Sequence, residues 1–312
     1  MIPLAFVTGF LGSGKTTFLE QLVRRHCQRR IVYLVNEFSA RDVDAARLLA
    51  QTPDVVAIAG GSIFCRCLVT EFINQLRSLP DRFGTSATPL DGVVVEASGM
   101  ANPAVAGQML CESQLDRVYK MAATVAVVDP GTLGKLLHTL PNVRAQIEAA
   151  NLVLLNKTDL YSSAMVGQAE AAIRGIHPAV PIERTSYCRT DVDVFGTRPP
   201  VAAHGELAAC VDPNYVTFDV PLTEELDLDR LRAAVELVRD EVYRIKGFAD
   251  VGGRRCRVDY SATQWTCEEI DGDPPPALVF IARGPCSPAV HELIRTRKSF
   301  MRTKSRKEAS RP

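Results

Sequence analysis

The stretch that most constrains the fold of this chain is a glycine-rich loop close to its first residue. It fits the pattern G-x-x-x-x-G-K-[ST] and reads Gly9-Phe10-Leu11-Gly12-Ser13-Gly14-Lys15-Thr16. An apolar run at residues 2–7 precedes the loop, and apolar residues at helical spacing follow it. The backbone N–H groups of such a loop and the N-terminus of the next helix form a cradle for phosphate groups. The loop therefore predicts binding of a nucleoside triphosphate.

The chemistry of phosphoryl transfer assigns roles within this loop and beyond it. We expect Lys15 to reach the β- and γ-phosphates and the Thr16 hydroxyl to ligate Mg2+. The apolar run at 91–95 ends in Glu96, an acid that can hold the same Mg2+, so Lys15, Thr16 and Glu96 are the catalytic candidates. Gly99 can place a backbone N–H near the γ-phosphate. The expected phosphate contacts are at Gly9, Gly12, Ser13, Gly14, Lys15, Thr16, Thr17 and Gly99.

A second motif predicts which base the nucleotide carries. A predicted strand at 151–155 delivers Asn156-Lys157-Thr158-Asp159, an N-K-x-D box. The Asp159 carboxylate can accept hydrogen bonds from N1–H and the 2-amino group of guanine, whereas adenine lacks both donors and would leave Asp159 buried and unpaired. Lys157 would lie along the base or support the loop. Ser186, beside Thr185, is placed to contact the guanine from a second loop.

The order of the predicted elements indicates two domains. Strands and helices alternate over residues 1–190, which predicts an α/β P-loop NTPase with a mostly parallel sheet flanked by helices. Residues 191–212 are rich in Pro and Gly and read as a linker. Beyond it we expect a smaller α+β domain at 213–300 with a helix over 227–244, and a basic, disordered tail at 301–312.

Composition narrows the function classes. Lys+Arg and Asp+Glu are both 36, so the total charge gives no reason to expect a nucleic-acid partner. We find no apolar run long enough to span a membrane and no signal peptide, and therefore expect no membrane partner. The nine cysteines lack the spacing of a disulfide framework. With a nucleotide motif of intracellular type, reduced thiols and a cytoplasmic location are expected.

Two stretches near strand ends suggest a second, metal-binding site. Glu37 follows the apolar run at 31–35, and Cys65 and Cys67 lie one residue apart in a glycine-led turn. Two thiolates and a carboxylate would give a borderline metal such as Zn2+ three ligands and leave one position open, which suits a metal that is handed on. The alternative is that both cysteines are ordinary small residues that begin a helix.

As a set, these motifs resemble the CobW-like GTPases, relatives of the urease and hydrogenase nickel-insertion GTPases. The resemblance rests on the P-loop, the N-K-x-D box, Asn36-Glu37-Phe38, Gly60-Gly61 with the cysteines, Glu96 to Pro103, Val128-Asp129, Arg244 to Gly247 and Phe280 to Arg283. It implies a GTP hydrolase whose nucleotide state is coupled to a bound transition metal that is delivered to a client protein. It also implies a metal on a Cys-x-Cys-Cys turn near the glutamate of the Asn-Glu-Phe stretch.

This chain departs from the family pattern at the metal. The turn reads Ser62-Ile63-Phe64-Cys65, so only the last family cysteine is matched and Cys67 is an addition. Ser39 replaces the glycine that follows Asn-Glu-Phe, and the region between the domains holds a single histidine, His204.

Three functions remain open from the sequence. The first is a metallochaperone or metal-insertion factor that uses GTP, Mg2+ and Zn2+, with Co2+ or Ni2+ as alternatives, and that serves an unidentified client as a monomer or homodimer. Its intrinsic turnover should be slow, because no catalytic base or arginine finger is evident. The second is a GTPase that assembles or activates a cofactor-dependent enzyme without a metal site of its own. The third is a small-molecule kinase, against which the N-K-x-D box argues.

Overall fold

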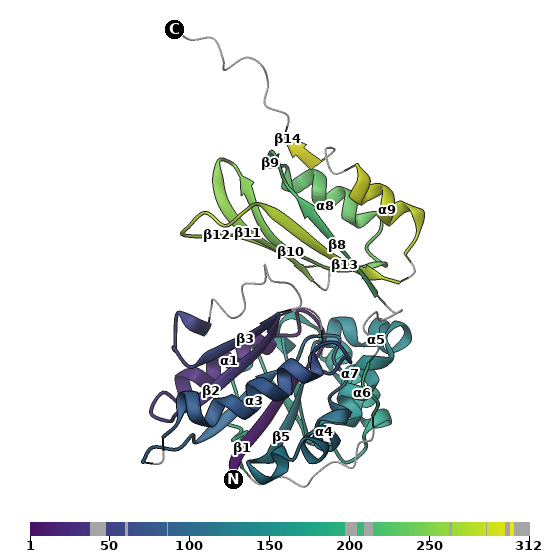
Figure 1. Ribbon diagram of the computed structural model, residues 1–312. Helices are drawn as coiled ribbons and strands as arrows, with labels where there is room; N and C mark the ends of the chain where they lie inside the picture. The colour runs from purple at the N-terminus through teal and green to yellow at the C-terminus, as the bar shows by residue number, and fades with distance from the viewer. Residues whose placement is uncertain are drawn as a thin grey trace. The chain divides into compact units, whose positions relative to one another are not determined.

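The computed structural model describes residues 1–37, 48–59, 62–85, 87–196, 205–208, 215–261, 264–284, 286–296 and 300–302. The chain divides into two compact units, Met1–Val211 and Asp212–Pro312. In Figure 1 the first unit runs from purple to teal and the second from green to yellow. The expected linker, 191–212, falls in large part outside the described residues.

The first unit is built on a seven-stranded parallel sheet in the order β3-β2-β4-β1-β5-β6-β7. Successive residues of β1 point to opposite faces, so that Leu4 and Phe6 join one apolar cluster and Ala5 and Val7 join another. Both faces are therefore covered, as a parallel sheet requires. The strands are β1 Ile2–Thr8, β2 Ile31–Glu37, β3 Val55–Ala59, β4 Gly92–Glu96, β5 Tyr119–Val128, β6 Leu152–Leu155 and β7 Ile182–Arg184.

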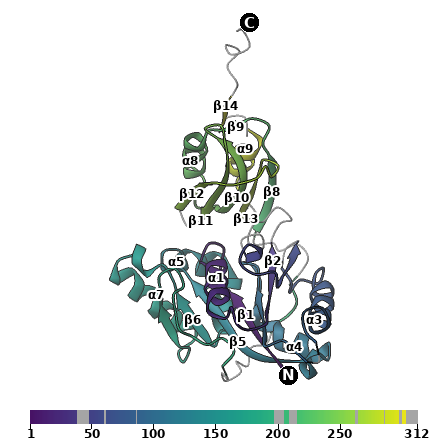
Figure 2. The same ribbon diagram turned by 90° about the vertical axis from the view of Figure 1, so that its left-hand side faces the viewer.

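Helices cover the two faces of this sheet, as Figure 2 shows. Phe72 and Leu76 of α3 pack in the first cluster, and Phe18 and Leu22 of α1 pack in the second. The helices are α1 Lys15–Arg25, α3 Val69–Phe83, α4 Ala106–Glu112, α5 Pro130–Thr139, α6 Pro141–Glu148 and α7 Ser163–Ile176, with short 3-10 turns η1 Pro103–Val105, η2 Leu115–Arg117 and η3 Thr158–Leu160. The predicted P-loop NTPase fold is confirmed.

One helix of this unit was not expected from the sequence. The spacing of apolar residues over 131–140 predicts a helix that Pro141 closes, but Pro141 instead opens α6. Proline is well tolerated at the first helical position because the N–H that it lacks would have no partner within the helix. Two side chains of α6 contact the loop that follows β4, as described below.

The second unit is an antiparallel sheet in the order β12-β11-β10-β13-β8, with a separate two-stranded pair, β14 and β9. Its apolar cluster joins strand residues such as Ile245 and Phe280 to Leu231 of α8 and Leu293 of α9. The elements are β8 Tyr215–Pro221, β9 Glu225–Leu226, α8 Leu228–Glu236, β10 Val242–Val251, β11 Arg254–Ser261, β12 Gln264–Glu269, β13 Ala277–Arg283, α9 Pro288–Arg295 and β14 Met301–Arg302.

The helix expected over 227–244 is wrong in its second half. α8 ends at Glu236, and Arg244 to Gly247 lie in β10, the central strand between β11 and β13. Val235, Val238 and Val242 recur at helical spacing, but pairing on both sides of β10 outweighs this local pattern. The tail expected from 301 is also not wholly irregular, because Met301 and Arg302 pair with β9.

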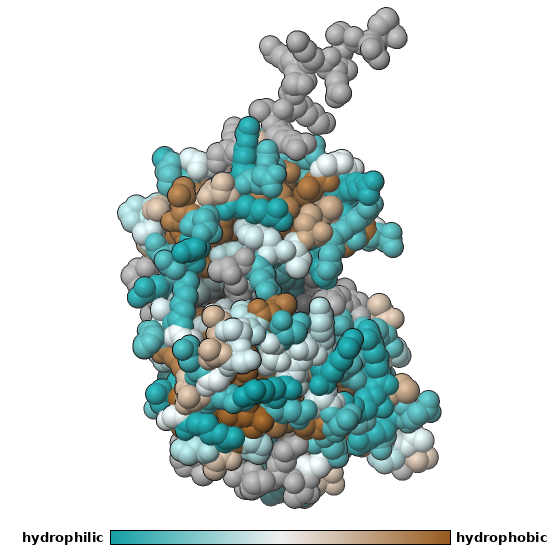
Figure 3. Space-filling view, turned by 180° about the vertical axis from the view of Figure 1, so that it is seen from behind, coloured by the Kyte–Doolittle hydropathy of each residue, from teal (hydrophilic) through white to brown (hydrophobic). Residues whose placement is uncertain are grey.

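The surfaces of the two units are mainly polar. In Figure 3 hydrophilic residues predominate on the visible face of each unit, and hydrophobic residues appear as separate patches. Within the described ranges, no helix is both long enough and apolar enough to cross a membrane.

Candidate functional site

The glycine-rich loop connects β1 to α1 and is shaped by three glycines. Gly9, Gly12 and Gly14 have φ values of 135°, 76° and 113°, in the left-handed region that favours glycine. A Cβ atom on Gly9 would lie 2.1 Å from the Val127 carbonyl oxygen, and one on Gly14 would lie 2.4 Å from Asn156 Nδ2. The loop therefore needs glycine both for its backbone conformation and for its packing.

The three catalytic candidates meet at the start of α1. Thr16 Oγ1 donates to both carboxylate oxygens of Glu96, at 3.3 and 3.4 Å. Lys15 is 6% exposed and its Nζ donates to the Phe10 carbonyl at 3.4 Å. Glu96, the last residue of β4, lies opposite Val7 of β1 and is 4% exposed. A hydroxyl and a carboxylate are oxygen ligands of the type Mg2+ prefers, so Thr16 and Glu96 could hold it together.

The segment after Glu96 packs against the glycine-rich loop. A Cβ atom on Gly99 would lie 2.7 Å from the Leu11 backbone nitrogen. Gln146 of α6, which is 1% exposed, donates from Nε2 to the carbonyls of Gly99 and Ala101 at 3.1 and 3.0 Å. Asn142 Nδ2, one helical turn earlier, donates to the Met100 carbonyl at 2.9 Å. Side chains of α6 thus hold residues 99–101, which are called the glycine loop below and are distinct from the glycine-rich P-loop. These contacts were not predicted, because α6 itself was not expected from the sequence.

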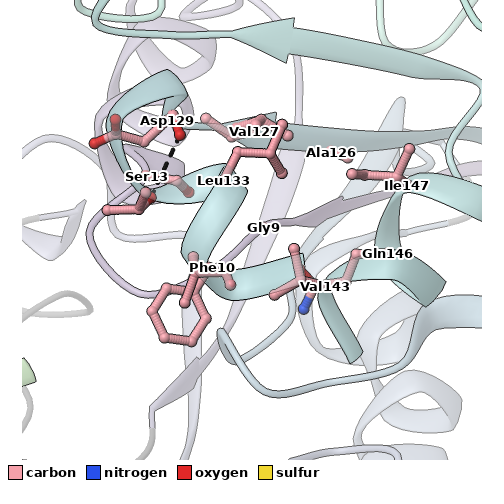
Figure 4. Close-up of a pocket in the computed structure, with 13 residues that line it drawn as sticks. Gly9, Phe10, Ser13, Ala126, Val127, Asp129, Leu133, Val143, Gln146 and Ile147 are labelled. Atoms are coloured by element: carbon pink, nitrogen blue, oxygen red, sulfur yellow. Dashed lines mark hydrogen bonds between the residues drawn. The ribbon is translucent and has the colours of Figure 1, made fainter. Parts of the chain in front are cut away.

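A small cavity lies beside the loop, as Figure 4 shows, with Gly9, Phe10 and Ser13 on one side and Val143 and Gln146 of α6 on another. Its volume is about 10 Å³, which suffices for one water molecule. The cavity is therefore not the nucleotide pocket.

Asn156 joins the loops expected around the nucleotide. Its Nδ2 donates to the Ser13 carbonyl at 2.9 Å, and its Oδ1 accepts from Thr185 Oγ1 at 3.2 Å and from the Cys188 backbone N–H at 2.9 Å. Cys188 Sγ donates to the Gly14 carbonyl at 3.4 Å, and burial raises the pKa of this thiol to about 12, so it stays neutral. Asn156 is 2% exposed, and its side chain forms hydrogen bonds to other parts of the protein, so it acts here by fixing the loops.

The rest of the box is arranged around Asp129. Lys157 has a positive φ of 61°, and its Nζ lies 2.9 Å from Asp129 Oδ2. Asp129 Oδ1 also accepts from the Gly131 N–H and so caps α5. No role was predicted for Asp129, although it follows the last residue of β5 and belongs to the Val128-Asp129 pair on which the family resemblance partly rests. Burial and the nearby Asp129 carboxylate both raise the pKa of Tyr161 above its usual value.

The two remaining guanine candidates lie on adjoining loops. Asp159 is exposed, and Ser186 is partly exposed. The Thr158 N–H and hydroxyl both donate to the Thr185 carbonyl at 3.1 Å, which brings the two loops together. Thr17, in the first turn of α1, is also partly exposed.

The expected metal ligands are only partly described. Glu37 ends β2, but its side chain lies outside the described residues. Cys65 is a free thiol and 6% exposed, whereas Cys67 is exposed and disulfide-bonded. In the described part of the chain, no three His, Cys, Asp or Glu side chains are grouped so that they could hold a metal ion. In the part of the chain that the structure describes, seven cysteines are free thiols, whereas the expectation of reduced thiols is wrong for Cys67. The spacing of the cysteines in the sequence gives no sign of this bond.

Comparisons with known proteins agree with the motifs. A family model described as the CobW/HypB/UreG nucleotide-binding domain matches residues 3–184, and one described as the cobalamin synthesis protein CobW C-terminal domain matches residues 215–297. The zinc chaperone CobW of Pseudomonas aeruginosa is 27% identical over 303 residues, covering 82% of this chain and 79% of the relative. The zinc-regulated GTPase metalloprotein activator 1 of Schizosaccharomyces pombe is 28% identical over 201 residues, covering 61% of this chain and 47% of the relative.

Among solved structures, the Zn(II)-bound YjiA GTPase from Escherichia coli is similar with a TM-score of 0.46. It is 19% identical, and the match covers 97% of this chain and 99% of that one.

Proposed function

Because the chain belongs to the CobW/HypB/UreG family of GTPases, we propose that it is a metal-handling GTPase that couples its nucleotide state to a transition metal held near Cys65. The metal is a cargo that is passed to a client protein. The observation that carries the nucleotide half is the Thr16–Glu96 contact at the start of α1. Zn2+ is the proposed metal, with Co2+ and Ni2+ as alternatives, and the proposed location is the cytoplasm.

The proposed hydrolysis uses residues of the first unit. Thr16 and Glu96 would hold Mg2+, and the ion would supply positive charge to the phosphates. Water attacks the γ-phosphorus, the bond to the β–γ bridging oxygen breaks, and GDP and phosphate leave. Lys15 and the backbone N–H groups of the loop stabilise the charge that develops on the phosphate oxygens, and the Gly99 N–H faces the γ-phosphate. Asp159 and Ser186 read the guanine, while Asn156 fixes the loops that present them.

The proposed cargo site consists of Cys65, Cys67 and Glu37. Two thiolates and a carboxylate suit Zn2+, and both relatives compared above carry zinc in their names. Cys67 is disulfide-bonded, so it becomes a ligand only after reduction. Metal loading should therefore require a reducing environment.

The test is a GTPase assay with and without Zn2+ in the presence of a thiol-free reductant. We expect Zn2+ to change the turnover of the wild type at least about fivefold, within the usual range of coupling between sites. Cys65→Ser combined with Cys67→Ser should abolish this response. Cys111→Ser is the matched control, because Cys111 is a free, exposed cysteine on α4. A response that is equal in the wild type and the double variant would reject the cargo site.

A second function is favoured by the Cys67 disulfide. If the cysteines are structural, the chain is a GTPase that assembles or activates a cofactor-dependent enzyme without its own metal site. Equilibrium dialysis of the reduced protein with Zn2+ and GTP separates the two. One bound Zn2+ per chain at micromolar concentration supports the first function, and its absence supports the second.

A further inference from the structure

One buried side chain connects the two halves of the proposed function. Asn36, next to last in β2, is 5% exposed. Its Oδ1 accepts from the backbone N–H of Ile63 at 3.0 Å and from that of Ser98 at 3.1 Å, and its Nδ2 donates to the Ile58 carbonyl at 3.3 Å. The two donors that share this oxygen belong to different loops, 27 and 62 residues away in the sequence.

The Ser98 side of this contact leads to the nucleotide site. Ser98 lies between Glu96, which contacts Thr16, and Gly99, which packs against Leu11 of the P-loop. The Ala97 N–H donates to the Val7 carbonyl at 2.9 Å, so the segment continues the sheet up to this point. The last backbone hydrogen bond to the sheet is at Ala97, and Ser98 directly precedes the glycine loop. A nucleotide that displaces the glycine loop should therefore also displace the Ser98 N–H.

The Ile63 side leads to the cysteine. The Cys65 N–H donates to the Ser62 carbonyl at 3.0 Å, and the Phe64 N–H donates to Ser62 Oγ at 3.2 Å. Ile63 and Phe64 are 0% and 1% exposed, and Phe64 packs against Phe6 of β1 with ring centroids 5.7 Å apart. Residues 62–65, called the cysteine loop below, form a closed and packed turn, so a shift at the Ile63 N–H reaches Cys65 with little loss.

We propose that Asn36 is the positioning residue that transmits the nucleotide state from the glycine loop to the cysteine loop. A single oxygen serves both N–H donors, so the position of one loop sets the hydrogen bond available to the other. Because such coupling is reciprocal, a ligand on Cys65 changes nucleotide affinity by the same factor. The inference deepens the proposed function and rests on it only for the identity of that ligand, since the link between the loops exists without a metal.

The test is amide hydrogen exchange of the full chain, with Mg2+ and either GDP or a non-hydrolysable GTP analogue, in the absence of transition metal. In the wild type we expect the exchange of the Phe64 and Cys65 amides to differ at least about fivefold between the two nucleotides. Asn36→Ala should reduce this difference to less than twofold while the P-loop amides still respond. Asn36→Asp keeps an acceptor oxygen and should restore the difference, which also covers the case in which the alanine variant fails to fold.

Asn142→Ala is the matched control. It removes an amide that holds the same glycine loop through Met100 but lies on α6. We expect this variant to keep the difference at Phe64 and Cys65. The inference is overturned if the wild type shows no nucleotide-dependent difference there, or if Asn36→Ala keeps it. A separate Zn2+ titration of the same proteins decides the proposed function, so loss of metal binding with intact exchange coupling rejects the cargo site alone.

Discussion

The first and last residues of the N-K-x-D box differ sharply in their surroundings. Asn156 is 2% exposed, and its side chain makes three hydrogen bonds, one to Ser13 of the glycine-rich loop and two to the loop that holds Thr185 and Cys188. Asp159 is exposed. The box thus combines a residue that fixes loops with a residue that is open to a ligand, and we propose that the second residue, Asp159, reads the base.

Replacing Asp159 should therefore change base specificity without unfolding the protein. Asp159→Asn removes the carboxylate that accepts from N1–H and the 2-amino group of guanine, and its amide can instead donate to the 2-oxo group of xanthine. Since hydrogen bonds to charged groups contribute about 1.5–3 kcal/mol each, GTP affinity should fall about 100-fold or more. XTP affinity should rise. Competition against a fluorescent GTP analogue measures both.

The control for this change is Asp116→Asn, at an exposed aspartate of η2. It should leave both affinities unchanged. An Asp159→Asn variant that still prefers GTP to XTP would show that the base is read elsewhere.

Some site residues could be located from a local sequence motif, and others could not. Lys15, Thr16 and Glu96 could be predicted because a motif and the ends of parallel strands place them at one edge of the sheet. Gln146 could not, because its contact with the glycine loop depends on how α6 packs. The disulfide state of Cys67 depends on a partner that the spacing of the cysteines does not reveal.

At the scale of elements, β10 shows how a strand can carry a helical pattern. It lies between β11 and β13, and its residues from Val242 to Ala249 are buried or nearly so. Asp259 of β11 forms an ion pair with Arg244 of β10, with Arg244 Nη2 and Asp259 Oδ2 2.9 Å apart. In the strand register, the residue directly opposite Asp259 is Lys246. The charged residues that the helical spacing places on the polar face of a helix instead pair with charged residues of the neighbouring strand.

This contact predicts how the stability of the second unit depends on pH. Burial would raise the pKa of Asp259, but the charge and hydrogen bond of Arg244, with Lys246 and Arg257, outweigh it and hold the pKa below its ordinary value. A carboxyl group whose pKa is lower in the folded than in the unfolded state stabilises the folded state at pH values above its unfolded pKa, which is about 3.9 for Asp. This contribution is lost as the pH falls through the folded pKa. Asp259→Asn should reduce the free energy of unfolding by about 1.5–3 kcal/mol at pH 7. This difference should shrink at pH 3.

Urea unfolding followed by Trp265 fluorescence measures this loss, since the Trp265 ring packs against the Tyr260 ring in a tilted arrangement with centroids 4.6 Å apart. Asp229→Asn is the control, because the Asp229 side chain is 92% exposed in its pair with Arg232. A surface pair of this kind contributes about 0–1 kcal/mol. An equal loss for Asp259→Asn at pH 3 and pH 7 would contradict the assignment.

At the scale of the molecule, each unit has an apolar core of its own. The fold class of both could be predicted, because alternation of strands and helices and the change of pattern after the linker are local features. The pairing of β9 with β14 could not be predicted. It joins Glu225–Leu226 to Met301–Arg302, and strands of two residues are too short to show a period.

Separate cores predict that nucleotide stabilises one unit and not the other. At 100 times its Kd, GTP with Mg2+ should add about 2.7 kcal/mol to the free energy of unfolding of the first unit. Trp265 is the single tryptophan of the chain and lies in β12 of the second unit, so its fluorescence reports on that unit. In urea titrations we expect GTP to move the first-unit transition seen by far-UV circular dichroism to higher urea, while the Trp265 midpoint stays within error. Lys15→Ala should remove the shift by weakening phosphate binding, and an equal shift at Trp265 would mean that the two units unfold as one.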